Sequence, residues 1–268
     1  MANRYPDIGI KGVCGVYSAQ YSLSRNIKSI FPFGQNTYIS QYSELPNITV
    51  TYSQYLDVAG SFNPLEFNSL TSIELVCGAS SVVCDDAILN EISYTFNLNG
   101  PFLVTRTYIG YKKPTSKSGT QDCSTNKFRP LSRKDYTGSI PGGISSSALI
   151  SVTATVSVDR QPILEFGSRK PYASVVNFPI TSSIKFEAYT NDSDSYVFDN
   201  AQNACGDYTI SGNTYSATAC GKGITINNAT LTDLIYSGGD ADSSQSPQTV
   251  SVTYTSYDTY SIKPAIYF

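Results

Sequence analysis

The sequence contains neither histidine nor tryptophan, and it has one methionine among 268 residues. Without histidine, a Ser-His-Asp triad, a Cys-His dyad and every zinc site with a histidine ligand are excluded. Charged residues are also scarce, at 15% of the chain with a net charge of −3. A strongly basic nucleic-acid-binding surface is therefore not expected.

Other signatures of chemistry are missing as well. The chain has no P-loop, no glycine-rich dinucleotide turn after a strand and no G-x-S-x-G elbow. A carboxylate pair of the glycosidase kind carries no signal in a chain with 21 acidic residues. We therefore expect a protein that is not an enzyme and that has neither a cofactor nor a metal site.

Long apolar runs are absent too. No stretch of about 18 apolar residues is present, and the residues from Met1 to Asp7 form no apolar signal core. We therefore expect a chain that is made in a cytosol, crosses no membrane and is not exported by the ordinary route.

Tyrosine is abundant, with 21 residues alongside many serines, threonines, glycines and asparagines, a mixture typical of short strands and turns. Apolar and polar residues alternate in residues 92–98, 150–158, 184–188 and 250–254. Such segments are typical of antiparallel strands with one buried and one wet face. Short helices are expected at Asn63 to Phe67, where Asn63 is the cap and Pro64 opens the first turn, and after Asp199. The sequence therefore predicts an all-β fold with one or two short helices.

The chain also repeats itself after about 134 residues. In each copy an alternating strand leads to an arginine, a Phe-Gly pair, a tyrosine, a serine and a proline, and another strand follows. Chance similarity between β sequences is the alternative. The repeat predicts tandem β domains at 1–113 and 147–268, joined by a basic loop rich in serine and glycine at 114–146. The first copy contains Arg25, Phe33-Gly34, Tyr38, Ser40 and Pro46, and the second contains Arg160, Phe166-Gly167, Tyr172, Ser174 and Pro179.

The second copy carries a family resemblance. Its segment from Ser157 to Tyr172, followed by Asn177-Phe178-Pro179, resembles a stretch of the tail tube proteins (major tail proteins) of tailed bacteriophages. Residues 12–55 resemble the N-terminal part of such proteins. The first copy departs from the pattern, because it has Gln35-Asn36-Thr37-Tyr38 where the second has the basic Arg169-Lys170-Pro171-Tyr172.

The resemblance implies tandem tail-tube-like β-sandwich or half-barrel domains that complete a β-barrel ring on oligomerisation. Rings stack into a hollow tube in the virion tail, which is assembled in the host cytoplasm, and genomic DNA passes through the lumen without specific binding. Relatives with two tandem domains form homotrimeric rings with pseudo-sixfold symmetry. We expect that arrangement here, with a homohexamer as the alternative. Stacked copies of the ring, a tail sheath and other tail proteins are the further partners implied.

Five residues are candidates for contacts between subunits: Arg25, Arg160, Arg169, Lys170 and Tyr172. Arg25 and Arg160 each follow an alternating strand, where a guanidinium can bind a carboxylate of a neighbouring subunit. A salt bridge within one domain is the alternative.

Charge is segregated along the chain. Residues 190–268 contain eight aspartates against Lys222 and Lys263. A basic loop that meets such an acidic surface on the next ring would set the stacking register, and a solvated linker is the alternative. The ring-stacking candidates are the seven cations of residues 111–134, which are opposed there by Asp122 alone: Lys112, Lys113, Lys117, Lys127, Arg129, Arg133 and Lys134.

The six cysteines form no C-x-x-C pair, so clustered metal ligation is not expected. The candidate disulfide is Cys205–Cys220, which brackets a hairpin-like segment with a Gly212-Asn213 turn. Closing this loop of about 16 residues would contribute roughly 3 kcal/mol. Two free thiols are the alternative.

These observations together predict a structural, self-assembling virion protein, the protomer of a phage tail tube. Within the same class, the alternative is a single-ring tail component such as a tube initiator, a baseplate hub or a neck protein. From another class, the alternative is a carbohydrate-binding or adhesive β-sandwich module, which the 21 tyrosines suggest.

Overall fold

The computed structural model describes residues 8–25, 27–31, 33–34, 36, 40–43, 45–57, 63–120, 129–141, 144–166, 168, 170–190, 213–237, 248–257, 260 and 262–268. In this part of the chain the fold is all-β, as predicted, and the helices are short 3₁₀ turns. The turn η1 (Pro64–Asn68) lies where a helix was expected, and the Asn63 side chain caps it by accepting a hydrogen bond of 3.0 Å from the Leu65 N–H. The helix expected after Asp199 lies outside the described residues.

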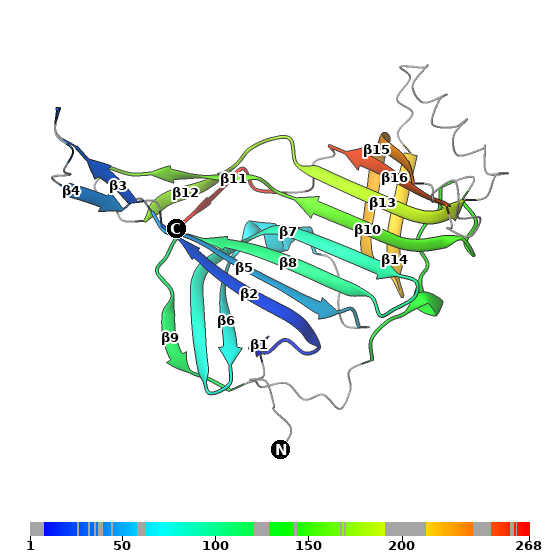
Figure 1. Cartoon of the computed structure of the whole chain (residues 1–268), viewed down its shortest axis with the longest axis horizontal. Coiled ribbons are helices and arrows are strands. Elements are labelled where there is room, and N and C mark those ends of the chain that lie inside the picture. Colours follow the sequence, from blue (N-terminus) through cyan, green and yellow to red (C-terminus); the bar gives the residue numbers. More distant parts are fainter. Residues whose placement is uncertain are drawn as a thin grey trace.

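Strands fill both halves of the chain (Figure 1). We call residues 8–118 the N-terminal unit and residues 131–268 the C-terminal unit. The N-terminal unit contains β1 (Ile8–Ile10), β2 (Val16–Ser24), β3 (Ile27–Ile30), β4 (Ser40–Ser43), β5 (Asn47–Tyr55), β6 (Leu70–Cys77), β7 (Ser80–Asn97), β8 (Leu103–Gly110) and β9 (Thr115–Ser118). The C-terminal unit contains η3 (Arg133–Asp135), β10 (Leu149–Ser157), β11 (Arg160–Leu164), β12 (Pro171–Val176), β13 (Thr181–Thr190), β14 (Asn213–Ala219), β15 (Lys222–Ser237), β16 (Gln248–Ser256) and β17 (Ala265–Tyr267).

Strands from both units form one 12-stranded antiparallel sheet. Its order is β2-β5-β8-β7-β10-β13-β16-β15-β14, and β1, β6 and β9 attach to the N-terminal side. The units meet where β7 pairs with β10, in the middle of the sheet (Figure 1). The two halves therefore share one sheet, which forms no closed barrel within the described residues. Smaller sheets are β3-β4 and β11-β12-β17.

The two units repeat the same topology and the same register. Each contributes four strands to the sheet in matching order, β2-β5-β8-β7 and β10-β13-β16-β15. The hairpin β3–β4 follows β2 in the chain as β11–β12 follows β10, and β6–β7 matches β14–β15. The ladder irregularities also fall at matching places: Val16/Ser18 and Leu149/Ser151, Thr71/Ile73 and Asn213/Tyr215, and Leu89/Glu91 and Leu231/Asp233. Because a bulge interrupts a ladder at one defined residue, this agreement supports the repeat predicted from the sequence.

The register corrects one part of the predicted alignment. Matching the bulges places Ser24 at the position of Ser157, so Arg25 corresponds to Val158 and Ile27 corresponds to Arg160. The predicted equivalence of Arg25 and Arg160 is therefore wrong, because two residues separate the first strand from the hairpin in both units. Phe33 and Phe166 are separated by the same number of residues as Ser24 and Ser157, so the two Phe-Gly pairs remain equivalent after this correction.

The core lies on the side of the large sheet that η1 covers. Apolar side chains at every second position of β7, β10 and β13, such as Ile92, Val156 and Ile184, are fully buried there. Phe96 is also fully buried, and its ring contacts Phe102 and Tyr136 at centroid distances of 5.1 and 5.5 Å. The alternation that predicted these strands is therefore confirmed.

The segment between the units is built into both of them. β9 pairs with β7 of the N-terminal unit. The backbone at Thr137 and Ser139 donates hydrogen bonds to Thr218 and Ser216 of β14, so this stretch covers the outer edge of the large sheet. β1 covers β6 in the same way in the N-terminal unit. The residues predicted as an inter-domain loop thus include the edge strand β9 and a stretch that pairs with β14, and both protect backbone groups from pairing elsewhere.

Buried tyrosines predict loss of stability in alkali. Burial raises the pKa of Tyr94 to about 12 and also raises those of Tyr108, Tyr136 and Tyr254. An unfolded tyrosine has a pKa of about 10. Because the unfolded chain releases these protons first, the stability present below pH 10 should fall as the pH rises toward 12.

Urea unfolding between pH 8 and 12 tests this expectation. The variant Tyr94→Phe should lose less stability over that range, because it removes one ionisable group whose pKa the fold raises. The substitution itself breaks no hydrogen bond, since the Tyr94 hydroxyl has no partner among the described residues. A free energy of unfolding that stays constant up to pH 12 would contradict the prediction.

Candidate functional site: edges, wet face and hairpins

The two ends of the sheet have unpaired strand edges. Within the described residues, β2 pairs with β5 alone, and residues 230–237 of β15 pair only with β16. Leu23 of β2 and Tyr236 of β15 are exposed there. Unpaired edges with apolar side chains favour association with another strand.

The pairing of β7 with β10, which we call the internal junction, shows how such edges fit together. β7 corresponds to β15, and β10 corresponds to β2. At the internal junction Ile92 lies opposite Val156, and both side chains are 0% exposed. The matching residues on the outer edges are Leu234 and Leu23. In the same way, Tyr94 lies opposite Ala154 at the internal junction. The matching residues on the outer edges are Tyr236 for Tyr94 and Tyr21 for Ala154.

The face of the sheet opposite the core is wet and rich in hydroxyl groups. Hydrogen bonds cross neighbouring strands there, as between Ser53 and Thr105 at 2.8 Å and between Ser93 and Thr155 at 2.9 Å. Lys185 is the one cation that the described part of β2, β5, β7, β8, β10, β13, β15 and β16 places on this face, and it pairs with Glu187 at 2.7 Å. We call this surface the wet face. With so little positive charge, it offers few contacts to phosphate groups.

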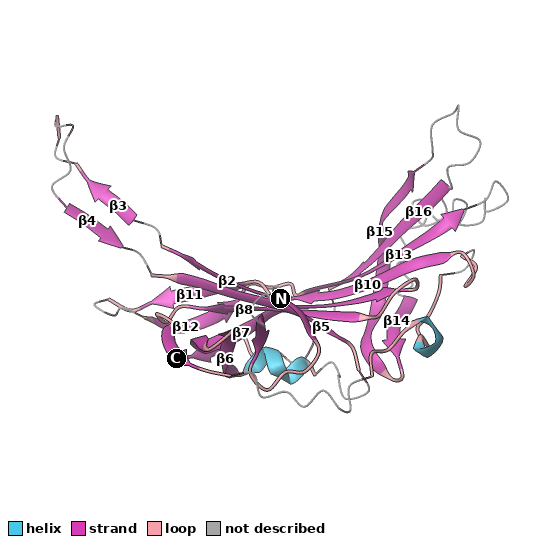
Figure 2. Cartoon of the chain, turned by 60° about the horizontal axis from the view of Figure 1, so that its bottom comes forward, coloured by secondary structure: helices cyan, strands magenta, loops and turns pink. Residues whose placement is uncertain are grey.

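The large sheet is curved. Figure 2 shows β13, β15 and β16 rising at one end of the large sheet, on the side away from η1, so that the sheet bends toward the wet face there. The large sheet thus combines a curved, hydrophilic face with unpaired strand edges at β2 and β15.

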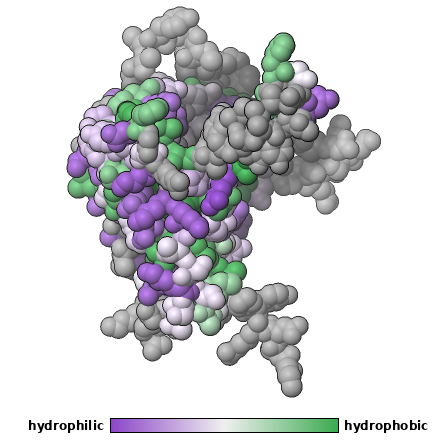
Figure 3. Space-filling view, turned by 90° about the vertical axis from the view of Figure 1, so that its left-hand side faces the viewer, coloured by the Kyte–Doolittle hydropathy of each residue, from purple (hydrophilic) through white to green (hydrophobic). Residues whose placement is uncertain are grey.

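Two hairpins extend from one end of the sheet. Their tips carry Phe33 and Phe166, which hold matching positions and are both fully exposed. Gly34, beside the first of them, has φ of 76°, a left-handed conformation that glycine adopts without strain. Figure 3 shows this end of the molecule, where hydrophobic residues reach the surface at several places among hydrophilic ones.

The two predicted arginines have different surroundings. Arg25 is exposed just after β2. Arg160 is buried, and its Nη2 donates a hydrogen bond of 2.7 Å to the Phe67 carbonyl oxygen, while burial lowers its pKa. Among the described residues Arg160 has no carboxylate within ion-pair distance. It therefore connects the two units of one chain rather than forming a salt bridge within one unit.

The other candidates for contacts between subunits lie on the second hairpin. Lys170 and Tyr172 are exposed, and the Tyr172 ring meets that of Tyr267 edge-on at 5.3 Å. Arg169 lies outside the described residues. Their role between subunits stays a prediction.

The basic segment is held by contacts within the chain. Lys112 lies 3.8 Å from Asp85 and 3.5 Å from Asp86. Arg129 lies 3.5 Å from Asp135, and Arg133 donates a hydrogen bond to the Ser146 carbonyl oxygen. Such contacts compete with stacking partners for these charges. Lys113, Lys117 and Lys134 are exposed, and Lys127 lies outside the described residues.

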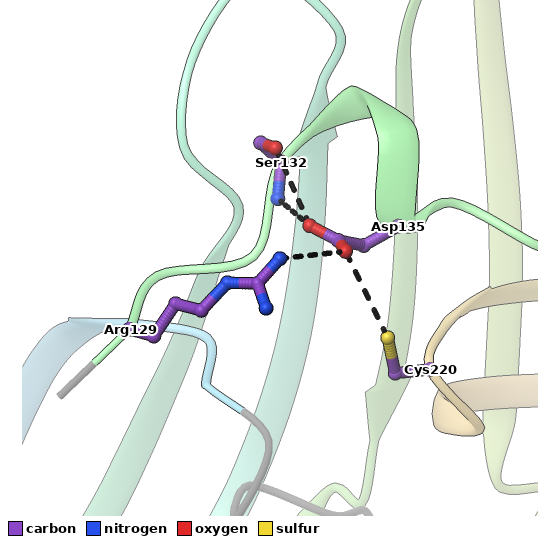
Figure 4. Close-up of polar contacts among 4 residues, drawn as sticks. All are labelled: Arg129, Ser132, Asp135 and Cys220. Atoms are coloured by element: carbon purple, nitrogen blue, oxygen red, sulfur yellow. Dashed lines mark hydrogen bonds and ion pairs between the residues drawn. The ribbon is translucent and has the colours of Figure 1, made fainter. Parts of the chain in front are cut away.

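Cys220 has a free thiol, so the predicted Cys205–Cys220 disulfide is wrong. Its sulfur lies 4.0 Å from Asp135 Oδ1, an oxygen that also faces Arg129 (Figure 4). The other Asp135 oxygen accepts hydrogen bonds from Ser132. Cys220 lies in the turn between β14 and β15. Gly212 of the predicted Gly212-Asn213 turn lies outside the described residues. Cys205 lies outside the described residues, and Cys14 is disulfide-bonded.

The N-terminal unit also contains a polar cavity of about 450 Å³. Arg106 lines it, donates a hydrogen bond of 2.9 Å to Gln54 and lies 3.9 Å from Glu66. Burial raises the pKa of Glu66, and Arg106 opposes that shift. The register places Val252 at the matching position of the C-terminal unit. The buried arginine is thus specific to one unit, and its charge is compensated by its neighbours.

Sequence reasoning missed the edge residues of β15. A signal for them was present, because Thr107-Tyr108-Ile109-Gly110-Tyr111 and Thr253-Tyr254-Thr255-Ser256-Tyr257 share their threonine and two tyrosines. These segments cover the ends of β8 and β16 and the residues that follow. Aligning them would have identified β16 as the counterpart of β8, and the strand before it, β15, as the counterpart of β7.

Comparison with known proteins adds no relative. No family model matches the chain, and no curated protein matches it significantly. Across the described residues, no helix is long and apolar enough to cross a membrane. In the same residues no cluster of three or more potential metal ligands occurs.

Proposed function

We propose that this protein is a structural subunit that assembles edge to edge with copies of itself into a ring. The internal junction is the observation that carries the proposal. One chain already joins two equivalent units through β7 and β10, and it leaves the same two edges unpaired at its ends. Pairing β15 of one copy with β2 of the next would repeat the internal junction between molecules.

This contact is heterologous, because it joins two different surfaces. Heterologous contacts form a ring when the rotation closes and an open filament when it does not. The curvature of the sheet favours closure (Figure 2). Three chains would bring six equivalent units together, and this homotrimer with pseudo-sixfold symmetry is the ring that we propose.

The wet face would line the ring. Its hydroxyl-rich surface, with Lys185 already paired to Glu187, suits passage of a polyanion without tight binding. Together with the resemblance of residues 157–172 to tail tube proteins, this supports a tail tube subunit whose rings stack around a channel for DNA. A single-ring tail component would use the same edges, and its low copy number per virion would distinguish it.

A cysteine pair tests the proposed contact between copies. Leu23→Cys and Leu234→Cys place thiols at the residues that match Val156 and Ile92. Opposite residues of an antiparallel pair lie close enough for a disulfide. The exposed thiols of Cys77 and Cys220 are first replaced by serine. After oxidation of the two single variants mixed together, we expect a covalent dimer in high yield, and electron micrographs of the protein should show rings or tubes.

The matched control pairs Leu23→Cys with Ile235→Cys. Ile235 is the next residue along β15, so its side chain lies on the other face of the sheet. This mixture should form little covalent dimer. Equal cross-linking of both mixtures, or a protein that stays monomeric at high concentration, would overturn the proposal.

A further inference from the structure

The second hairpin packs against the unit that precedes it in the chain. Arg160, at the start of β11, reaches the Phe67 carbonyl oxygen of η1. Tyr111, which directly follows β8, is buried, and Phe268 directly follows β17, the strand that pairs with β12 of this hairpin. The Tyr111 ring also meets that of Phe268 at 5.9 Å. The contact between the units therefore includes the hairpin as well as the internal junction.

The first hairpin has no preceding unit in its own chain. β3 and β4 stand out beyond the rest of the molecule (Figures 1 and 2). Ile27, which corresponds to Arg160, is 60% exposed, whereas Arg160 is 6% exposed. Tyr257 directly follows β16 and so corresponds to Tyr111. It is 58% exposed, whereas Tyr111 is 7% exposed.

We propose that the β3–β4 hairpin docks onto the C-terminal unit of a neighbouring copy, with Ile27 packed against Tyr257 of that copy. The proposal rests on the ring proposed above, because only a copy paired through β15 and β2 brings these residues together. It adds a second contact that does not follow from edge pairing alone. The geometry of the internal contact identifies the occupant as a second copy of this chain.

The chemistry of the two residues suits this contact. The Ile27 side chain is uncharged, so it needs no ion-pair or hydrogen-bond partner in the contact. Packing this aliphatic side chain on an aromatic ring removes apolar surface from water. The internal counterpart contains a buried arginine instead, which needs the Phe67 carbonyl oxygen as an acceptor. The contact between copies would therefore be less polar than the contact within one chain.

Mixed single-cysteine variants test the hairpin contact separately from the strand contact. In the background without Cys77 and Cys220 thiols, Ile27→Cys is mixed with Tyr257→Cys and oxidised beside the mixture of Leu23→Cys and Leu234→Cys. We expect a mixed covalent dimer from both mixtures. The matched control replaces Ile27→Cys by Phe33→Cys, whose thiol is fully exposed but lies at the far tip of the hairpin, and it should give at least about tenfold less product.

The outcomes separate the two proposals. Cross-linking of the strand pair without the Ile27–Tyr257 pair would overturn the hairpin contact and leave the ring intact. Cross-linking of neither pair would overturn both. Equal product from Phe33→Cys and Ile27→Cys would show random collision of exposed thiols and would also overturn the hairpin contact.

Discussion

Replacing Leu23 by aspartate should abolish assembly while leaving the chain folded. Leu23 is exposed on the β2 edge, and its counterpart Val156 is fully buried at the internal junction. In the proposed contact the aspartate would be buried without a cation. Such burial costs several kcal/mol, and about 3 kcal/mol already weakens association about a hundredfold. Sedimentation velocity should show monomers at concentrations where the unmodified protein forms rings.

The matched control for this variant is Leu70→Asp. Leu70 is similarly exposed but lies on β6, beside the internal junction and away from both outer edges. This variant should assemble normally, which would separate loss of the contact from a general effect of added charge. Rings formed by Leu23→Asp at unchanged concentration would contradict the proposed pairing of β2 with β15.

Replacing Phe96 by alanine should destabilise both units together. Its ring fills the core at the internal junction, where it contacts Phe102 and Tyr136. Truncating a buried phenylalanine to alanine typically costs about 3–5 kcal/mol, a large share of the roughly 5–15 kcal/mol that stabilises a folded protein. Because one sheet spans both units, we expect a single unfolding transition in urea at a much lower denaturant concentration.

Phe33→Ala and Phe166→Ala are the controls for this prediction. Both rings are fully exposed at the hairpin tips, so each variant should change the free energy of unfolding by no more than about 0.5 kcal/mol. Two separate unfolding transitions in Phe96→Ala would show that the units fold independently, contrary to the prediction.

Local alternation predicted four strands of the large sheet, since residues 92–98, 150–158, 184–188 and 250–254 coincide with parts of β7, β10, β13 and β16. Ile92, Val156, Ile184 and Val252 are buried because alternate side chains of a strand point to the same face, and one face of this sheet packs on the core. The Asn63 cap was also recognisable, because it depends on neighbours in the sequence. The repeat further indicated that the chain contains two equivalent halves.

The role of single candidate residues was harder to predict. Arg160 contacts a carbonyl group on η1, and Cys220 lies beside Asp135, 85 residues away. Neither neighbour can be identified from residues close in the sequence. The cations Lys112 and Arg129 have acidic neighbours in the fold, which their clustering in the sequence did not indicate.

By itself, the sequence determined the positions and inward-facing residues of β7, β10, β13 and β16 and the duplication, because each depends on a period or a motif that local residues encode. Only the tertiary structure decided that β7 pairs with β10 and that β2 and β15 are left with open edges. Strand pairing depends on hydrogen bonds between segments far apart in the chain, and a period of two fits several partners equally well. For the same reason, the exposure of Ile27 and Tyr257 became visible only when each could be compared with its buried counterpart.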